Sequence, residues 1–204
     1  SFTNEEESLK RAIDKAGICV LHAPLFHPAM KNVAPIRREL GVKTFFNMLG
    51  PMVNPAKPTN QLVGVFNLEL ARKYGYLYQK GTKSYAILHA IDGYDEIALT
   101  GPTKMISNTS EIVLTPESFN VKKIAQHQIY GGDTIEASAE IFQQILQNQG
   151  TEAQTNVVCA NAGVAISIVD KCSLLEGFQR AKESLSSGKA LESLKKLQTL
   201  SASI

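Results

Sequence analysis

The chain has 204 residues, of which 44% are hydrophobic and 20% are charged, and its formal net charge at pH 7 is +2. This composition is ordinary for a soluble globular protein with enough material for a core. The nearly balanced charge argues against a nucleic-acid or membrane partner, because both need a concentrated basic face.

Neither a membrane span nor a signal peptide is predicted. The longest apolar run, residues 157–169, is interrupted by polar side chains and is shorter than the roughly 20 residues that a membrane helix needs. Residues 1–15 are acidic and polar, unlike a signal peptide. The three cysteines, Cys19, Cys159 and Cys172, form no C-x-x-C pair and have apolar neighbours, which predicts buried free thiols in a reducing compartment. We therefore expect a cytoplasmic protein.

Apolar periodicity predicts the elements of the first part of the chain. Residues 4–15 have the spacing of an amphipathic helix, which Gly17 ends. Residues 18–21 are continuously apolar, as is typical of a strand buried on both faces of a parallel sheet. Two helical pieces follow at residues 28–40 and 44–49, and each ends at a glycine-containing turn.

Strands and helices alternate over the rest of the chain. The patterns predict strands at residues 61–65, 85–89 and 112–114. They predict helices at residues 68–78, 134–149, 156–169, 174–186 and 190–200. This alternation indicates an α/β fold with a mostly parallel sheet flanked by helices. No linker divides the chain, which predicts a single domain over residues 1–204.

Asp95 and Glu96 form the first candidate site. They follow the predicted strand at residues 85–89 and a turn at Gly93, which places them beyond the carboxyl end of a strand, where open parallel sheets bind ligands. Adjacent carboxylates on a loop suit Mg²⁺, which takes one or two protein carboxylates and completes its shell with water and substrate phosphate. A solvated acidic turn is the alternative, and these two residues by themselves leave both readings open.

Arg37, Gly50 and Pro51 form the second candidate site. The planar guanidinium of Arg37 can hold a carboxylate through two parallel hydrogen bonds, which a lysine cannot do. The Gly-Pro turn offers bare backbone to a ligand. The alternative for Arg37 is an ordinary surface cation. His27 occupies a turn beside a proline, where a capping or structural role also fits.

Two further patterns do not predict a site. Residues 131–133 read Gly-Gly-Asp, but they lack the G-x-G-x-x-G spacing and follow no buried strand, which predicts a tight turn before the helix at residues 134–149. His22, His89 and His127 do not have the spacing of metal ligands. The cysteines are too far from them in sequence to form a zinc finger with them. We expect no zinc site.

Eight motifs occur in a fixed order along nearly the whole chain. They are H-P-A-M-K-x-V-x-P-x-R at residues 27–37, T-x-F-N-x-L-G-P-x-x-N-P-A at 44–56, DGYDE at 92–96, GPT at 101–103, TPESF at 115–119, YGGD at 130–133, ANAG at 160–163 and SLSSGKALESLKKL at 184–197. In this combination the chain resembles the C-terminal α/β portion of the anthranilate phosphoribosyltransferases.

The resemblance implies a fold of the nucleoside phosphorylase/phosphoribosyltransferase C-terminal domain type. It also implies an activity, the transfer of the phosphoribosyl group of phosphoribosyl pyrophosphate (PRPP) to the amine of anthranilate with release of pyrophosphate, in the second step of tryptophan biosynthesis. In such a reaction the protein contributes positioning and charge neutralisation, and we assign no residue as a catalytic nucleophile or base.

The same resemblance implies roles for the candidate residues. Asp95 and Glu96 bind a Mg²⁺ ion that also contacts the pyrophosphate. Anthranilate is bound by Arg37, which holds its carboxylate, and by Gly50, Pro51 and His27, which lie around the rest of the molecule.

The chain departs from the family in one respect. The glycine-rich phosphate loop (Gly-Thr-Gly-Gly-Asp) and the Lys-His-Gly-Asn segment of the family do not occur in these 204 residues. We therefore expect this chain alone to be an inactive fragment, and we expect the homodimer only for the full-length enzyme, because the family dimerises through an N-terminal helical domain. The alternatives are a pyrimidine nucleoside phosphorylase-like enzyme and a non-catalytic module that binds aromatic acids.

Overall fold

The computed structural model describes residues 2–27 and 50–202. Arg37 and the helices predicted at residues 28–40 and 44–49 lie outside the described residues. Contacts divide the chain into two compact units, of which one comprises Pro58–Gly188 and the other combines Ser1–Lys57 with Lys189–Ile204. The single domain over residues 1–204 stays a prediction.

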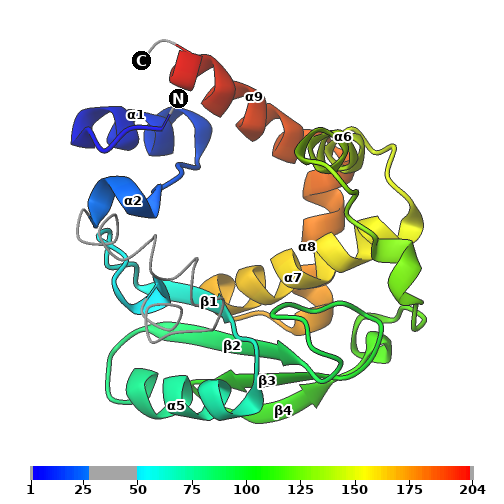
Figure 1. Cartoon of the computed structure of the whole chain (residues 1–204). Helices are drawn as coiled ribbons and strands as arrows, with labels where there is room; N and C mark the ends of the chain where they lie inside the picture. The colour runs from blue at the N-terminus through cyan, green and yellow to red at the C-terminus, as the bar shows by residue number, and fades with distance from the viewer. Residues whose placement is uncertain (1, 28–49, 203–204) are drawn as a thin grey trace. The chain divides into compact units, whose positions relative to one another are not determined.

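The larger unit is built on a four-stranded sheet (Figure 1). Its strands are β1 (Asn60–Gly64), β2 (Ser84–Ala90), β3 (Thr103–Ser107) and β4 (Glu111–Leu114), and they lie in that order across the sheet. β1 and β2 are parallel, whereas β2 pairs antiparallel with β3, and β3 with β4. Helices flank this sheet, so the predicted α/β class is confirmed.

The strand pairing corrects the expectation of a mostly parallel sheet. β3 was not predicted, because its polar residues Thr103 and Lys104 obscure its alternation. A tight turn joins β3 to β4, in which the Ser107 N–H donates to the Ser110 carbonyl at 2.8 Å. Such a short connection can join only antiparallel strands, because a parallel pair needs a crossover of a dozen or more residues.

Two helices cover opposite faces of the sheet (Figure 1). α5 (Leu68–Tyr78) contacts β2 and β3, and α7 (Glu152–Asp170) contacts β1 and β2. On the α5 side, the rings of Tyr78 and Tyr85 stack with their centroids 5.2 Å apart. Leu88, whose side chain alternates to the other face, is 1% exposed. Burial of a side chain of this size stabilises the fold by about 1.5–3 kcal/mol. Because helices cover both faces of β2, this strand is the centre of the core.

The other elements of the larger unit are helical. They are η2 (Pro116–Phe119), η3 (Gln126–Ile129), α6 (Ile135–Leu146) and α8 (Leu174–Ser186). α5 and α8 have the predicted bounds, and α6 and α7 differ from their predictions by a few residues at their ends. The side chains of Thr134, Thr151 and Ser173 each accept a hydrogen bond from a backbone N–H at the start of α6, α7 and α8. Short hydroxyl side chains commonly cap helices in this way.

α7 and α8 approach each other closely because two glycines lie at their contact. A Cβ added to Gly163 would lie 2.7 Å from the backbone nitrogen of Phe178, and one added to Gly177 would lie 2.2 Å from the carbonyl oxygen of Gly163. A side chain at either position would force the helices apart. The Phe178 ring also packs on Phe119, at 5.6 Å between centroids. These contacts fix α7 within the larger unit.

No single helix in the described part of the chain is long and apolar enough to cross a membrane. α7 and α8 together have the length and apolar composition of a membrane span, but the two helices are bent by 116° relative to each other.

The smaller unit is helical in its described part. It contains α1 (Glu6–Ala16), α2 (Ala23–Phe26), η1 (Gly50–Met52) and α9 (Lys189–Ala202), and α1 packs against α9. Gly17 ends α1 with a φ of 73°, as predicted, because glycine adopts this left-handed conformation without steric cost.

Residues 18–21 do not form the predicted strand. Ile18 and Val20 are 45% and 46% exposed. A strand needs a partner for its backbone hydrogen bonds, whereas this segment lies beside helices, and Cys19 and Val20 line a pocket together with residues of α1 and α9. An apolar run of four residues cannot by itself distinguish these two environments.

Candidate functional site

Asp95 and Glu96 lie in the loop between β2 and β3, which follows the carboxyl end of β2. Gly64, at the carboxyl end of the parallel neighbour β1, contacts the same loop. A Cβ added to Gly64 would lie only 1.7 Å from the carbonyl oxygen of Asp95, so the loop backbone crosses directly over the end of β1. This is the position at which α/β sheets bind ligands.

The surroundings of this pair disfavour the ionised form of Glu96. Both residues are exposed at the surface. The pKa of the Glu96 carboxyl is raised, first by partial desolvation and then by the negative charge of Asp95. Placing two carboxylates together in this way makes the second negative charge unfavourable, and a cation bound between them would relieve that repulsion.

Hydrogen bonds within the loop hold its backbone in a defined path. The Ala90 N–H donates to the Tyr94 carbonyl at 2.9 Å, and the Thr100 hydroxyl donates to the carboxylate of Asp92. Gly93 has a φ of 109° and Leu99 a φ of 59°. A leucine in the left-handed region costs roughly 1–2 kcal/mol, which the surrounding contacts must offset. These contacts give the loop backbone a defined path.

Asn161 of α7 completes this support, and sequence reasoning assigned it no role. Its side-chain oxygen accepts from the Ile97 N–H at 2.9 Å, and its side-chain nitrogen donates to the Ile97 carbonyl at 2.9 Å. The signals in the sequence are one asparagine within the apolar stretch at residues 157–169 and its place in the ANAG motif at residues 160–163. Gly64 was also missed, because nothing in the sequence shows which backbone passes close to it.

The two carboxylates fit the coordination that Mg²⁺ prefers. This ion commonly binds one or two protein carboxylates and takes its other ligands from water and substrate phosphate. In the described ranges, 2–27 and 50–202, no group of three or more His, Cys, Asp or Glu side chains could hold a metal ion. A pair that leaves most of the coordination shell open suits a metal shared with a phosphate ligand. The role of Asp95 and Glu96 as ligands stays a prediction.

Three of the four predicted anthranilate residues belong to the smaller unit. His27 follows α2, is half-buried, and donates its backbone N–H to the Ala23 carbonyl at 2.9 Å. Gly50 and Pro51 begin η1, and no described residue other than its chain neighbours lies within 4 Å of the place where a Cβ of Gly50 would be. Arg37 lies outside the described residues. The grouping of these four residues around one ligand stays a prediction.

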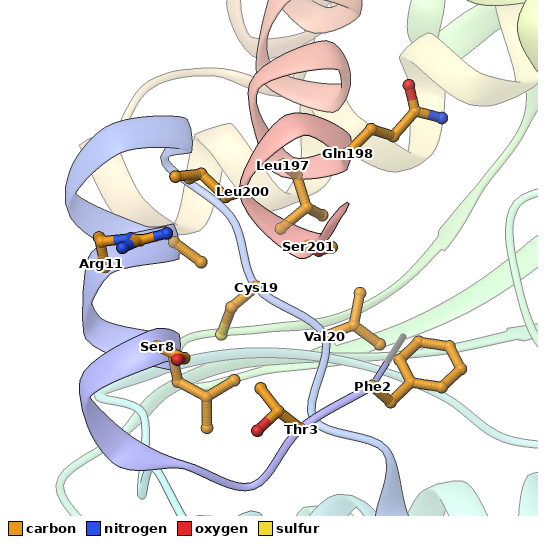
Figure 2. Close-up of a pocket in the computed structure, with 12 residues that line it drawn as sticks. Phe2, Thr3, Ser8, Arg11, Cys19, Val20, Leu197, Gln198, Leu200 and Ser201 are labelled. Atoms are coloured by element: carbon orange, nitrogen blue, oxygen red, sulfur yellow. The ribbon is translucent and has the colours of Figure 1, made fainter. Parts of the chain in front are cut away.

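The smaller unit also has an apolar pocket of about 250 Å³. Figure 2 shows Leu197 and Leu200 of α9 beside the segment that carries Cys19 and Val20. Arg11 of α1 lies at its edge. Of the predicted site residues that the structure describes, none lines this pocket. It corresponds to the packing between α1, residues 19–20 and α9 rather than to either candidate site.

The patterns that were set aside have structural roles. The Gly-Gly-Asp stretch forms the predicted turn, with a φ of 90° at Gly132, and Thr134 then caps α6. Inside the larger unit, the Nδ1 atom of His89 lies 2.9 Å from the Val65 carbonyl oxygen, and the residue is buried. A buried histidine with such a partner serves the packing of β1 against β2.

The cysteines are free, as predicted, but only one is buried. Cys159 lies in the core, where burial raises the pKa of its thiol. Cys19 and Cys172 are half-buried. The expectation of three buried thiols is therefore correct for Cys159 alone, because apolar sequence neighbours do not ensure burial.

Comparison with known families agrees with this architecture. Residues 1–191 match the family described as "Glycosyl transferase family, a/b domain". The chain belongs to this glycosyl transferase family. A relative within it, the anthranilate phosphoribosyltransferase of Flavobacterium johnsoniae, is 64% identical over 200 residues, which are 98% of this chain and 61% of that protein. The resemblance predicted from the motifs is confirmed, and the chain spans about 61% of the length of this relative.

Solved glycosyl transferase structures have the same fold. The anthranilate phosphoribosyltransferase of Thermus thermophilus matches with a TM-score of 0.83 and 32% identity, over 95% of this chain and 59% of that one. The anthranilate phosphoribosyltransferase of Saccharomyces cerevisiae in complex with PRPP and Mg matches with a TM-score of 0.79 and 26% identity, over 89% of this chain and 52% of that one.

Proposed function

We propose that this chain is part of an enzyme that transfers the phosphoribosyl group of PRPP to the amine of anthranilate. In that reaction the bond between the amine nitrogen and C1 forms, the C1–O bond to pyrophosphate breaks, and the amine loses a proton. The observation that carries the proposal is the Asp95–Glu96 pair, held on a well-defined loop beyond the end of β2. The 64% identity to an anthranilate phosphoribosyltransferase supports the choice of substrates.

In this proposal Asp95 and Glu96 bind Mg²⁺ on the pyrophosphate side of the reaction. The yeast relative bound to PRPP and Mg supports the use of this ion. When bound, Mg²⁺ neutralises negative charge on the departing pyrophosphate. The chain contributes a defined backbone position for the two carboxylate residues, because the loop backbone is held by Gly64 on one side and by Asn161 on the other.

The anthranilate side is assigned to Arg37, His27, Gly50 and Pro51. Arg37 would hold the substrate carboxylate through two parallel hydrogen bonds, which orients the amine as well as binding it. Gly50 and Pro51 would offer backbone and an apolar ring to the aromatic substrate, with His27 near that ring. The cytoplasmic location and the homodimer of the full-length enzyme stay predictions.

The metal assignment is tested by changing both carboxylates in a full-length protein that carries this chain. The double variant Asp95→Asn/Glu96→Gln should abolish turnover and leave anthranilate binding, measured by calorimetry, nearly unchanged. Asp133→Asn/Glu136→Gln is the matched control, because it removes two exposed carboxylates from another part of the same unit. Full turnover by Asp95→Asn/Glu96→Gln would mean that the pair is a solvated acidic turn and not a metal site.

The anthranilate assignment is tested by Arg37→Lys. The variant keeps the charge but loses the planar fork, so the use of anthranilate should weaken by about 1–3 kcal/mol, as measured by kcat/KM. The KM for PRPP should change little. If Arg37→Ala leaves the KM for anthranilate unaltered, another group holds the carboxylate.

Calorimetry distinguishes the alternative functions. An anthranilate phosphoribosyltransferase of full length should bind both PRPP and anthranilate, whereas a non-catalytic module should bind only the aromatic acid. A pyrimidine nucleoside phosphorylase-like enzyme should bind a nucleoside instead. The 204-residue chain alone should show no phosphoribosyl transfer, because it has no glycine-rich loop whose backbone N–H groups could bind the pyrophosphate.

A further inference from the structure

The loop that carries Asp95 and Glu96 changes abruptly from exposed to buried. The two acidic residues are exposed, whereas Ile97, Ala98 and Leu99, which follow directly, are each 1% exposed. Buried backbone N–H and C=O groups need hydrogen-bond partners, and a loop has no neighbouring strand to supply them. The groups that satisfy this buried stretch therefore also determine the path of the chain just before it.

Asn161 supplies those partners for Ile97, the residue next to Glu96. The Ile97 N–H donates to the Asn161 side-chain oxygen, and the Asn161 side-chain nitrogen donates to the Ile97 carbonyl, both at 2.9 Å. The second hydrogen of that nitrogen is donated to the Val157 carbonyl, one turn earlier in α7, also at 2.9 Å. We call these three hydrogen bonds the Asn161 clamp.

The clamp has a single orientation. One side of the amide meets a donor, and the other side meets two acceptors, so a flipped amide would lose all three bonds. The bond to Val157 fixes the side chain on its own helix, and α7 is in turn held against α8 by the contact of Gly163 with Gly177. The position of Ile97 is thereby set by the core of the larger unit.

A second fixed point lies on the other side of the acidic pair. Gly64 packs against the carbonyl of Asp95, and the Tyr94 carbonyl accepts from the Ala90 N–H at the end of β2. The backbone that carries Asp95 and Glu96 is therefore held at both ends.

We propose that Asn161 is a positioning residue for the Asp95–Glu96 pair, which acts through the backbone of Ile97 and does not itself touch the substrate. This inference rests on the proposed function, since it assigns Asn161 to the metal side of that site. The expected consequence is specific. Loss of the clamp weakens the binding of the metal and its pyrophosphate ligand but spares the binding of anthranilate.

The test uses Asn161→Ala in the full-length protein, with Asn161→Asp as a second variant that keeps the side-chain size and the acceptor for the Ile97 N–H. Ser167→Ala is the matched control, because it removes a 2.8 Å hydrogen bond to the Val164 carbonyl that lies entirely within α7. Each variant is measured by hydrogen exchange at the Ile97 amide, by Mn²⁺ binding with inorganic pyrophosphate using electron paramagnetic resonance, and by KM values for both substrates.

For Asn161→Ala we expect exchange at the Ile97 amide to be about tenfold faster. We expect Mn²⁺ binding to be about tenfold weaker, as is typical when a residue that orients a metal ligand is lost. The KM for PRPP should rise and the KM for anthranilate should remain unchanged. Asn161→Asp should be impaired at least as much as Asn161→Ala, because its second carboxylate oxygen would face the Ile97 and Val157 carbonyl oxygens, to which it cannot donate. Ser167→Ala should match the wild type.

Two outcomes would overturn the inference, and they differ in what else they reject. If Asp95→Asn/Glu96→Gln abolishes Mn²⁺ binding but Asn161→Ala and Asn161→Asp bind it as the wild type does, Asn161 has no positioning role and the proposed function remains. If Asp95→Asn/Glu96→Gln also binds Mn²⁺ normally, the metal assignment of the proposed function fails and the role of Asn161 fails with it.

Discussion

The loop at residues 91–102 and the turn at residues 130–133 resemble each other in sequence. Each combines aspartate with a glycine of positive φ, 109° at Gly93 and 90° at Gly132. Their hydrogen bonds differ in the number of residues that separate the two partners along the chain. In the turn, the Tyr130 hydroxyl donates to Asp133 three residues away, and the Ser138 hydroxyl donates to Gly131 seven residues away. In the loop, Ile97 is bonded to a residue 64 positions along the chain.

This difference separates a capped turn from a candidate binding site. Local hydrogen bonds stabilise the turn and the start of α6, but they connect it to nothing else. The loop is held by strand β1 through Gly64 and by helix α7 through Asn161, so the backbone that carries its two carboxylates keeps a defined position relative to the sheet. A defined position is what a metal site requires, since ligand geometry depends on the groups behind the ligands.

Among substitutions that test the difference between the loop and the turn, Gly64→Ala should have the largest effect on the free energy of unfolding. The new Cβ would lie 1.7 Å from the Asp95 carbonyl oxygen, so the backbone must move. We expect a loss of about 1–3 kcal/mol or more in the free energy of unfolding, measured with denaturant, together with loss of turnover.

Gly131→Ala is the control in the turn. The space where its Cβ would lie is open to 4 Å, so the free energy of unfolding should change by less than about 0.5 kcal/mol. Equal effects of the two substitutions would mean that the loop and the turn do not differ in the proposed way.

A smaller effect, with a characteristic pH dependence, is expected for Glu96→Gln. The pKa of Glu96 is raised in the folded protein, so its ionised form costs stability above the unfolded carboxyl pKa of about 4.3. The metal-free variant should therefore have a higher Tm than the wild type at pH 7, and the difference should disappear as the pH falls below about 4.

Glu117→Gln should have the opposite sign. The pKa of Glu117 is lowered by a hydrogen bond from Thr115, so the ionised form is favoured in the folded protein and its removal should lower Tm at pH 7. Scanning calorimetry over pH measures both variants. A Glu96→Gln protein that is less stable than the wild type at neutral pH without metal would contradict the repulsion inferred within the acidic pair.

The smallest effect is expected for Tyr130→Phe in the turn. The variant removes the hydrogen bond to Asp133 between two exposed residues, and the free energy of unfolding should change by less than about 0.5 kcal/mol. Steady-state kinetics of the full-length protein should be unaltered. A loss of turnover would break the comparison, because it would assign the turn a part in the reaction.

Sequence patterns predicted the long helices well. α5 and α8 have the predicted bounds because each has an apolar face of helical periodicity, and in the structure the side chains of Asn67 and Ser173 cap their starts. The weak elements were predicted less well. Residues 18–21 are apolar, but they lie beside helices and form no strand. β3 contains polar residues, and the short turn that joins it to β4 determines its pairing more than its own apolar pattern does.

The acidic pair of the candidate site was visible in the sequence, whereas its support was not. Asp95 and Glu96 follow a strand and a glycine turn, which is a local pattern. Gly64 and Asn161 act on them through contacts between distant parts of the chain, and a single sequence carries no information on such pairs. Arg37, which lies outside the described residues, remains a prediction from the motif at residues 27–37.

The 64-residue separation of Ile97 and Asn161 has a consequence for biosynthesis. On the ribosome the loop emerges long before α7, and domains fold as their segments become available. Strands β1 to β4 can pair while α7 is still being translated, but the Ile97 backbone has no clamp until that helix has left the exit tunnel and docked. A nascent chain that stalls before residue 152 would thus hold its acidic loop without the Asn161 clamp, and the proposed metal site would be positioned only after α7 has docked.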